Sequence, residues 1–112
     1  MKIKTLITVT LLCLGLAAAV QSQVVSQAYE VALSDFRAPA TENGGVTFKE
    51  CADCDRKVVR VTSGTHYTVN GKAVRLQDFR KAVSQADDRD EKTVIVLHHL
   101  ESDTVVSIAV SI

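Results

Sequence analysis

The chain of 112 residues contains no tryptophan, one proline, two tyrosines and three phenylalanines, and its 13 basic side chains are matched by 13 acidic ones. Nucleic-acid-binding domains usually carry a basic face, and those that hold single strands add aromatic side chains on which bases stack. The sequence also lacks the polybasic segment that holds a protein to an anionic membrane surface. We therefore expect no nucleic-acid partner.

The sequence also lacks an apolar run long enough for a membrane-spanning helix, which needs about 18 apolar residues or more. The longest run, residues 6–16, follows two early lysines and precedes Ala17-Ala18-Ala19. This pattern is typical of an export signal. We predict a signal peptide at residues 1–19, with cleavage after Ala19 or, alternatively, after Ser22. The mature protein would be periplasmic or extracellular, without stable membrane insertion.

Removal of such a signal changes the composition of what remains. Cys51 and Cys54 become the only cysteines, and acidic side chains then outnumber basic ones by two. Residues 20–45 are Gln- and Ser-rich at first and later contain Pro, Asn and paired Gly, which predicts a flexible lead-in with a short helix at about 28–36. Residues 46–112 are predicted to form one small β-rich domain.

Short β-branched runs and one helical pattern occupy this second segment. Asn70-Gly71 is a strong hairpin signal, and Leu76, Phe79 and Val83 recur at helical spacing. The predicted strands span 46–50, 57–62, 66–69, 72–75, 93–100 and 104–112, and the predicted helix spans 76–86. The expected fold class is α+β, mostly β.

The last two strands are expected to pair as a hairpin whose register defines the core face. With Ser102-Asp103 as the loop, His99 lies at the edge of the core and His98 lies at the surface. The residues predicted on the core face are Ile95, Leu97, Val106, Ile108 and Val110.

The order of strands and helix, together with the segment Tyr67-Thr68-Val69-Asn70-Gly71, resembles small exported bacterial OB-like domains of uncharacterised role. The resemblance implies a small five-stranded OB-like barrel with one helix between strands 3 and 4. An open antiparallel sheet with one packed helix is the alternative. OB barrels commonly bind ligands over their second and third strands, which implies Arg60, His66 and Tyr67 as a possible binding face.

The motif Cys51-Ala52-Asp53-Cys54 allows three interpretations. An even pair of cysteines in an oxidising compartment favours a disulfide between Cys51 and Cys54. The second interpretation is a zinc site in which His66 and His98 complete the ligand set. The third is a redox-active pair, although the acidic neighbours of the motif should raise the thiol pKa and disfavour that use.

The sequence carries no phosphate-binding loop, no nucleophile paired with a base and no paired catalytic carboxylates. We therefore expect a non-enzymatic binding or structural accessory domain without a cofactor, acting on an envelope or extracellular protein or on a small ligand. A zinc-binding or thiol-redox protein that uses Cys51 and Cys54 is the alternative. The expected oligomeric state is a monomer or a weak homodimer, the latter through the apolar strand at 104–112.

Overall fold

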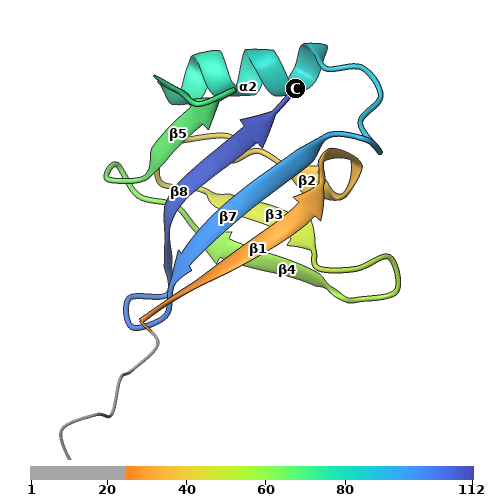
Figure 1. Cartoon of the computed structure of the whole chain (residues 1–112). Coiled ribbons are helices and arrows are strands. Elements are labelled where there is room, and N and C mark those ends of the chain that lie inside the picture. The colour runs from red at the N-terminus through yellow and green to blue at the C-terminus, as the bar shows by residue number, and fades with distance from the viewer. Residues whose placement is uncertain (1–24) are drawn as a thin grey trace, which may run out of the picture.

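A computed structural model describes residues 25–112 of the chain (Figure 1). The predicted signal peptide at residues 1–19 and both predicted cleavage sites lie outside the described residues. Within residues 25–112, eight strands, one α-helix and one short 3₁₀ helix follow each other. In order they are β1 (Ser26–Ala32), the 3₁₀ helix (Leu33–Asp35), β2 (Phe36–Arg37), β3 (Gly45–Lys49), β4 (Arg56–Arg60), β5 (His66–Val69), β6 (Lys72–Val74), α2 (Leu76–Gln85), β7 (Thr93–His99) and β8 (Thr104–Ser111).

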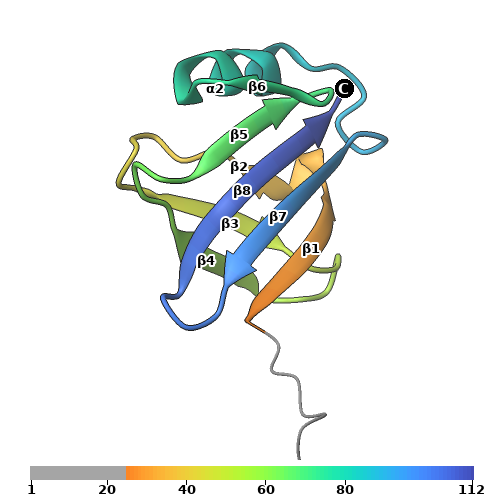
Figure 2. The same ribbon diagram turned by 60° about the vertical axis from the view of Figure 1, so that its left-hand side comes forward.

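The strands form a single, strongly coiled sheet with the order β1-β7-β8-β4-β3-β2. Strand β8 is its centre, because it pairs with β7 along one side and with both β4 and β5 along the other. The coiling places β1, β7, β8 and β5 in one layer and β2, β3 and β4 in a second layer, as both views show (Figures 1 and 2). The sheet does not close, so the expected fold class, α+β and mostly β, is confirmed while a closed five-stranded barrel is not what the strands form.

Helix α2 covers the end of the space between the two layers (Figure 1). It buries Leu76, Phe79 and Val83, as their spacing predicts. The Phe79 ring contacts Phe36 from the second layer and Tyr67 from the first, with ring centroids 6.2 and 5.2 Å apart. The helix therefore joins the two layers through one fully buried aromatic side chain.

The hairpin of β5 and β6 turns at Asn70-Gly71, as the sequence predicts. Asn70 and Gly71 both have positive φ, at 51° and 83°, which is the geometry that a tight two-residue hairpin turn requires. The Asn70 side chain also accepts a hydrogen bond from the backbone N–H of Ile112 at 2.8 Å. This bond fixes the end of the chain beside the turn.

The short helix expected at about 28–36 is wrong, because this stretch contains a strand that pairs with β7 along its whole length. The apolar residues Tyr29, Val31, Leu33 and Phe36 are buried in the core. Residues 26–37 thus belong to the folded domain, as two strands and the 3₁₀ helix between them, and the flexible lead-in expected at 20–45 is incorrect over this part. The alternation of apolar and polar residues in β1 is visible in the sequence. The polar residues around it nevertheless favoured the prediction of a flexible segment.

The register expected for the last hairpin is off by one residue. A four-residue turn, Leu100 to Asp103, joins β7 to β8 and places Val94 opposite Val110 and Val96 opposite Ile108. Because side chains alternate between the faces of a strand, this shift turns Ile95 and Leu97 away from the core. Ile108 and Val110 are buried as expected. An irregularity in the pairing at Leu97/His98 then brings Val105 inward in place of Val106.

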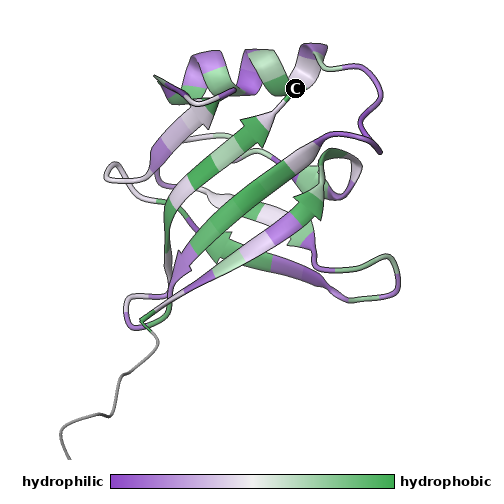
Figure 3. Ribbon diagram, in the orientation of Figure 1, coloured by the Kyte–Doolittle hydropathy of each residue, from purple (hydrophilic) through white to green (hydrophobic). Residues whose placement is uncertain are grey.

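Consecutive residues of β7 are apolar (Figure 3), so the alternation of its sequence did not distinguish the two registers. Val94 and Val96 are fully buried, whereas Ile95 is 45% exposed. No helix within residues 25–112 is long and apolar enough to cross a membrane.

Candidate functional site

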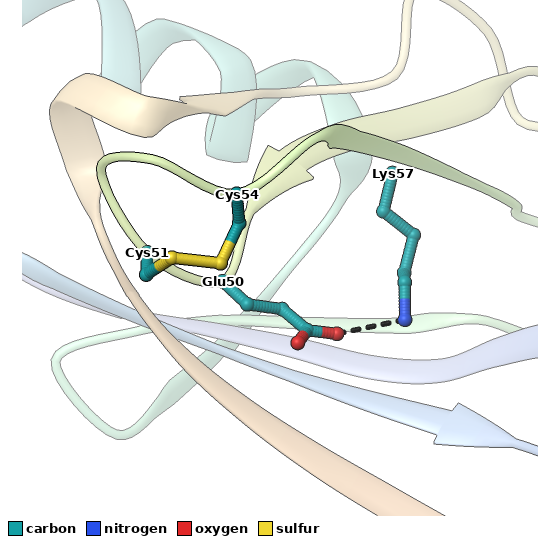
Figure 4. The surroundings of a disulfide bond; sticks show 4 residues. All are labelled: Glu50, Cys51, Cys54 and Lys57. Atoms are coloured by element: carbon teal, nitrogen blue, oxygen red, sulfur yellow. Dashed lines mark hydrogen bonds and ion pairs between the residues drawn. A yellow bond between two sulfur atoms is a disulfide. The ribbon is translucent and has the colours of Figure 1, made fainter.

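Cys51 and Cys54 lie in the turn between β3 and β4, at disulfide distance, with their Cα atoms 5.0 Å apart (Figure 4). The N–H of Cys54 donates to the carbonyl of Cys51 at 3.2 Å, so the four residues form a tight turn. Cys51 is exposed and Cys54 is half-buried. The pair therefore sits at the tip of a hairpin, where a disulfide would fix the turn.

An ion pair ties this turn to the first strand. The Nζ atom of Lys57 lies 2.7 Å from Glu50 and also donates to the hydroxyl of Tyr29 at 3.3 Å. The ammonium stands 4.8 Å from the centre of the Tyr29 ring as well. Its hydrogen bond to Glu50, and then that to Tyr29, raise the pKa of Lys57. These contacts favour the charged form of Lys57. Through Tyr29 on β1, the Lys57 side chain on β4 also links the two layers.

The four residues considered as zinc ligands are not brought together. The β3–β4 turn with Cys51 and Cys54 lies on the opposite side of the molecule from β5, which begins at His66 (Figures 1 and 2). Among residues 25–112, no three His, Cys, Asp or Glu side chains cluster as metal ligands.

The two adjacent histidines exchange the places expected for them. His98 is 8% exposed, and its Nε2 atom lies 2.7 Å from a carboxylate oxygen of Asp103, while its Nδ1 atom has no partner among residues 25–112. His99 is half-buried and its Nδ1 atom lies 2.9 Å from the hydroxyl of Ser102. Both histidines thus hold the β7–β8 turn, and the shifted register explains why His98 is the inner one.

Of the expected binding face, Arg60 and His66 are exposed but Tyr67 is buried, with 6% of its surface exposed. The expectation that Tyr67 would be an exposed contact residue is therefore wrong. Its ring packs against Phe79 on α2, which accounts for the burial. Tyr67 nevertheless lines an open cavity.

This cavity, of about 220 Å³, opens beside the β5–β6 hairpin. Its walls come from segments far apart in sequence, namely the loop between β2 and β3, the turn before β5 and the residue that precedes α2. The β2–β3 loop and the turn before β5 lie side by side (Figure 2), and the N–H of Val61 donates to the carbonyl of Gly44 at 2.9 Å. We call this cavity the Tyr67 cleft; its polar lining includes Glu42, Thr62, Ser63, His66, Tyr67 and Arg75.

A second hollow of about 320 Å³ adjoins the Tyr67 cleft. The two cavities share Glu42, Arg75 and Leu76, so they form one groove. We call the second part the arginine hollow, because Arg75 and Arg80 both line it. The guanidinium of Arg80 donates to the carbonyl of Ala40 at 3.4 Å, which holds it at the rim.

A bend between β4 and β5 makes room for the Tyr67 cleft. Strand β4 pairs with β8 only at Thr104, and β5 resumes the pairing at Ser107, with a turn between them. Inside this turn the buried hydroxyl of Thr65 donates to the carbonyl of Val105 at 2.7 Å and accepts from the N–H of Thr62 at 3.0 Å. A side chain thus replaces the backbone pairing that is interrupted at the bend.

The hydroxyl of Tyr67 has unsatisfied hydrogen-bonding capacity in the fold. It is buried and has no hydrogen-bond partner among the described residues. Burial raises the pKa of Tyr67 above its ordinary value of 10.0, and the negative charge of Glu42 raises it further. At neutral pH the group is therefore an uncharged hydroxyl that can both donate and accept a hydrogen bond.

Sequence reasoning missed Glu42, Thr65, Arg75 and Arg80. A signal existed for Arg75 alone, because it stands at the N-cap of α2, where Ser, Thr or Asp is usual. An arginine side chain has no acceptor with which to cap a helix N-terminus, and Arg75 instead lines both parts of the groove. Nothing in the sequence places Glu42 at the same cavity as Tyr67, since the β2–β3 loop reaches β5 only through long-range packing.

We predict that Tyr67→Phe raises the free energy of unfolding by about 1 kcal/mol, because it removes a buried polar group without a partner and keeps the ring in place. Urea denaturation would measure the change. The control is Tyr29→Phe, which removes a hydroxyl that Lys57 does bond and should not stabilise the fold. A loss of stability in Tyr67→Phe comparable with that of the control would contradict the prediction.

The same substitution should alter the response to alkaline pH. Because the pKa of Tyr67 is raised in the folded state, its contribution to stability is complete below the unfolded-state pKa of about 10 and is lost as the pH rises through the folded-state value. The loss of stability above this pH should be smaller in Tyr67→Phe than in the unaltered protein.

No protein-family model, no curated protein and no solved structure matches the chain. The function must therefore be argued from the groove and its residues.

Proposed function

We propose that this protein is an exported, non-catalytic binding domain that holds a small polar ligand in the Tyr67 cleft. The observation that carries the proposal is that Tyr67 lines an open cavity while its buried hydroxyl has no partner among the described residues. Leaving such a group unpaired costs about 1 to 3 kcal/mol. A ligand that bonds to the hydroxyl would recover part of this cost, so the cleft favours a polar occupant.

The pairing of the strands supports an OB-like interpretation of this site. If β1 and β2 are taken as one bent strand, and β4 with β5 as another, each long segment pairs with the neighbours expected in a five-stranded Greek-key barrel. In that interpretation α2 lies between the third and fourth strands. The third strand then carries His66 on its exposed face, where OB domains commonly bind their ligands, while Tyr67 faces inward.

Export is supported by the N-terminal sequence and by the cysteine pair. Two lysines, an apolar run and Ala17-Ala18-Ala19 stand in the order of a signal peptide. Cys51 and Cys54 lie at disulfide distance in the β3–β4 turn, and structural disulfides persist mainly outside the cytosol. We propose a periplasmic or extracellular location, where the ligand would be a small molecule or part of an envelope protein.

Titration of the ¹⁵N-labelled protein with four small probes tests the binding function. The probes are acetamide, acetate, methylammonium and glycylglycine. At least one of them should shift the backbone amide signals of His66, Tyr67 and Arg75 in a saturable way, and Tyr67→Phe should weaken that binding. Shifts confined to the distant β3–β4 turn, or none with any probe, would refute the proposed function.

The second candidate is a thiol-redox or zinc protein, which the exposure of Cys51 favours. Intact-mass measurement of protein recovered from the exporting compartment separates the two. Our proposal predicts a chain that starts at Val20, lacks metal and gains the mass of two hydrogen atoms when reduced. A mature protein with two thiols that react freely before reduction, or with stoichiometric zinc, would support the second candidate instead.

A further inference from the structure

We propose that the outer face of β2, β3 and β4 is a docking surface for an anionic phospholipid membrane, on which the protein binds reversibly without inserting. We call this surface the basic face; its residues are Arg37, Gly45, Thr47, Lys49, Arg56, Val58 and Arg60. The inference goes beyond the proposed function, because none of these residues lines the Tyr67 cleft or the arginine hollow. It follows from burial, register and charge in the second layer of the sheet (Figure 1).

The alternation of side chains along β2, β3 and β4 determines what the basic face contains. Four inward side chains of these strands are buried and apolar, and the fifth is turned towards Tyr29; they are Phe36, Val46, Phe48, Val59 and Lys57. The residues between them point outwards. Four of the outward side chains are cations and none is acidic. Arg37, Arg56 and Arg60 are exposed, and Lys49 is half-buried.

Two of these cations stand directly opposite each other. The register of β3 and β4 pairs Lys49 with Arg56, and like charges in directly opposed positions destabilise a sheet. Neither has a counter-ion, because the ion pairs within residues 25–112 are those of Lys57 and His98, and the rest of the chain contains no acidic residue. An external anion would relieve this repulsion, so the arrangement favours an anionic partner.

The charge of the basic face is opposite to that of the domain as a whole. Acidic side chains outnumber basic ones by two in residues 25–112, yet the outward positions of three neighbouring strands are purely basic. A field of one sign over one face orients a protein towards an oppositely charged surface. The sequence contains no polybasic segment, because only the pairing of the three strands brings these cations together.

Val58 gives the basic face an apolar centre. Its side chain is 69% exposed, more than that of any other large hydrophobic residue that the structure describes. Along β4 the next outward residues on either side of it are Arg56 and Arg60. An apolar side chain between cations suits the headgroup region of a bilayer, where apolar burial and attraction to anionic lipids both contribute to binding. Guanidinium groups also bind phosphate oxygens through paired hydrogen bonds.

The composition of the basic face favours a lipid surface over an anionic polymer. It carries no aromatic side chain on which the bases of a nucleic acid could stack. The Tyr67 cleft and the arginine hollow are lined by other residues, so an acidic peptide would find neither of them at this face. A membrane needs no groove, because it meets the strands as an extended surface.

Flotation with lipid vesicles tests the docking surface. The exported protein, recovered from the exporting compartment, is mixed with vesicles of phosphatidylcholine alone or of phosphatidylcholine and phosphatidylglycerol in equal parts. We expect binding to the anionic vesicles only, and its loss in salt of about 1 M, where the Debye length falls to about 3 Å. All variants carry the same N-terminus, so differences between them report on the substituted residues.

Substitutions assign the binding to the basic face. The double variant Arg56→Gln/Arg60→Gln removes two of its cations and should weaken binding to anionic vesicles about 25-fold, or about fivefold for each cation. The matched control is Lys72→Gln/Lys81→Gln, which removes two exposed cations from β6 and α2 and should bind about as well as the unaltered protein. Val58→Thr keeps the branched shape and should weaken binding about threefold.

The stability of the single variant Arg56→Gln gives a readout that needs no membrane. Because this substitution removes the like charge opposite Lys49, it should not lower the midpoint of urea denaturation. A clearly lower midpoint would contradict the repulsion on which the proposal rests.

The outcomes of the flotation decide the proposal. Equal binding to neutral and anionic vesicles, or equal losses in Arg56→Gln/Arg60→Gln and its control, would overturn it. Poly-glutamate and a DNA oligonucleotide serve as soluble polyanions. If either binds through Arg56 and Arg60 while the anionic vesicles do not bind, the partner is a polymer and the membrane assignment is wrong. None of these results bears on the ligand of the Tyr67 cleft.

Discussion

The hydroxyl of Thr65 holds together the part of the fold on which the groove depends. Strands β4 and β5 address the same side of β8 but are separated by a bend, so the backbone pairing is broken between them. The Thr65 side chain spans the break, donating to Val105 and accepting from Thr62. One buried side chain thus lets a continuous segment turn sharply without leaving the neighbouring backbone groups unpaired.

This bend determines where the cavity lies. It carries the turn before β5 outwards to meet the β2–β3 loop, and it places Tyr67 at the first inward position after the turn. The ring is then held by Phe79 of α2, and the buried hydroxyl has no partner among the described residues. The aromatic ring thus supports the fold, and in the proposed function the unpaired hydroxyl is the group that a ligand would satisfy.

Much of the secondary structure could be predicted from the sequence because its signals are local. Asn70-Gly71 forms the expected turn, and the spacing of Leu76, Phe79 and Val83 gives the buried face of α2. The register of the last hairpin could not be predicted, since Ile95 and Val96 are equally suited to a core. The choice between them depends on the length of the turn, which local alternation does not specify.

The groove was less predictable because long-range packing assembles it. Tyr67 and His66 were identified through the OB-like resemblance, but alternation within a four-residue strand could not show which of the two is buried. Glu42 comes from a loop that was expected to precede the domain. Only Arg75 carried a local clue, in the form of an arginine at a helix N-cap. Sites formed where loops converge generally lack such clues.

The role of Thr65 is tested most directly by comparing the free energies of unfolding of Thr65→Val and Thr65→Ser. Valine keeps the shape of threonine without the hydroxyl, whereas serine keeps the hydroxyl and loses a methyl group. We predict that Thr65→Val loses about 2 kcal/mol or more, because Val105 and Thr62 are left unpaired in a buried site, and that Thr65→Ser loses clearly less. Equal losses in the two variants, or a Thr65→Val protein as stable as the original, would contradict the account.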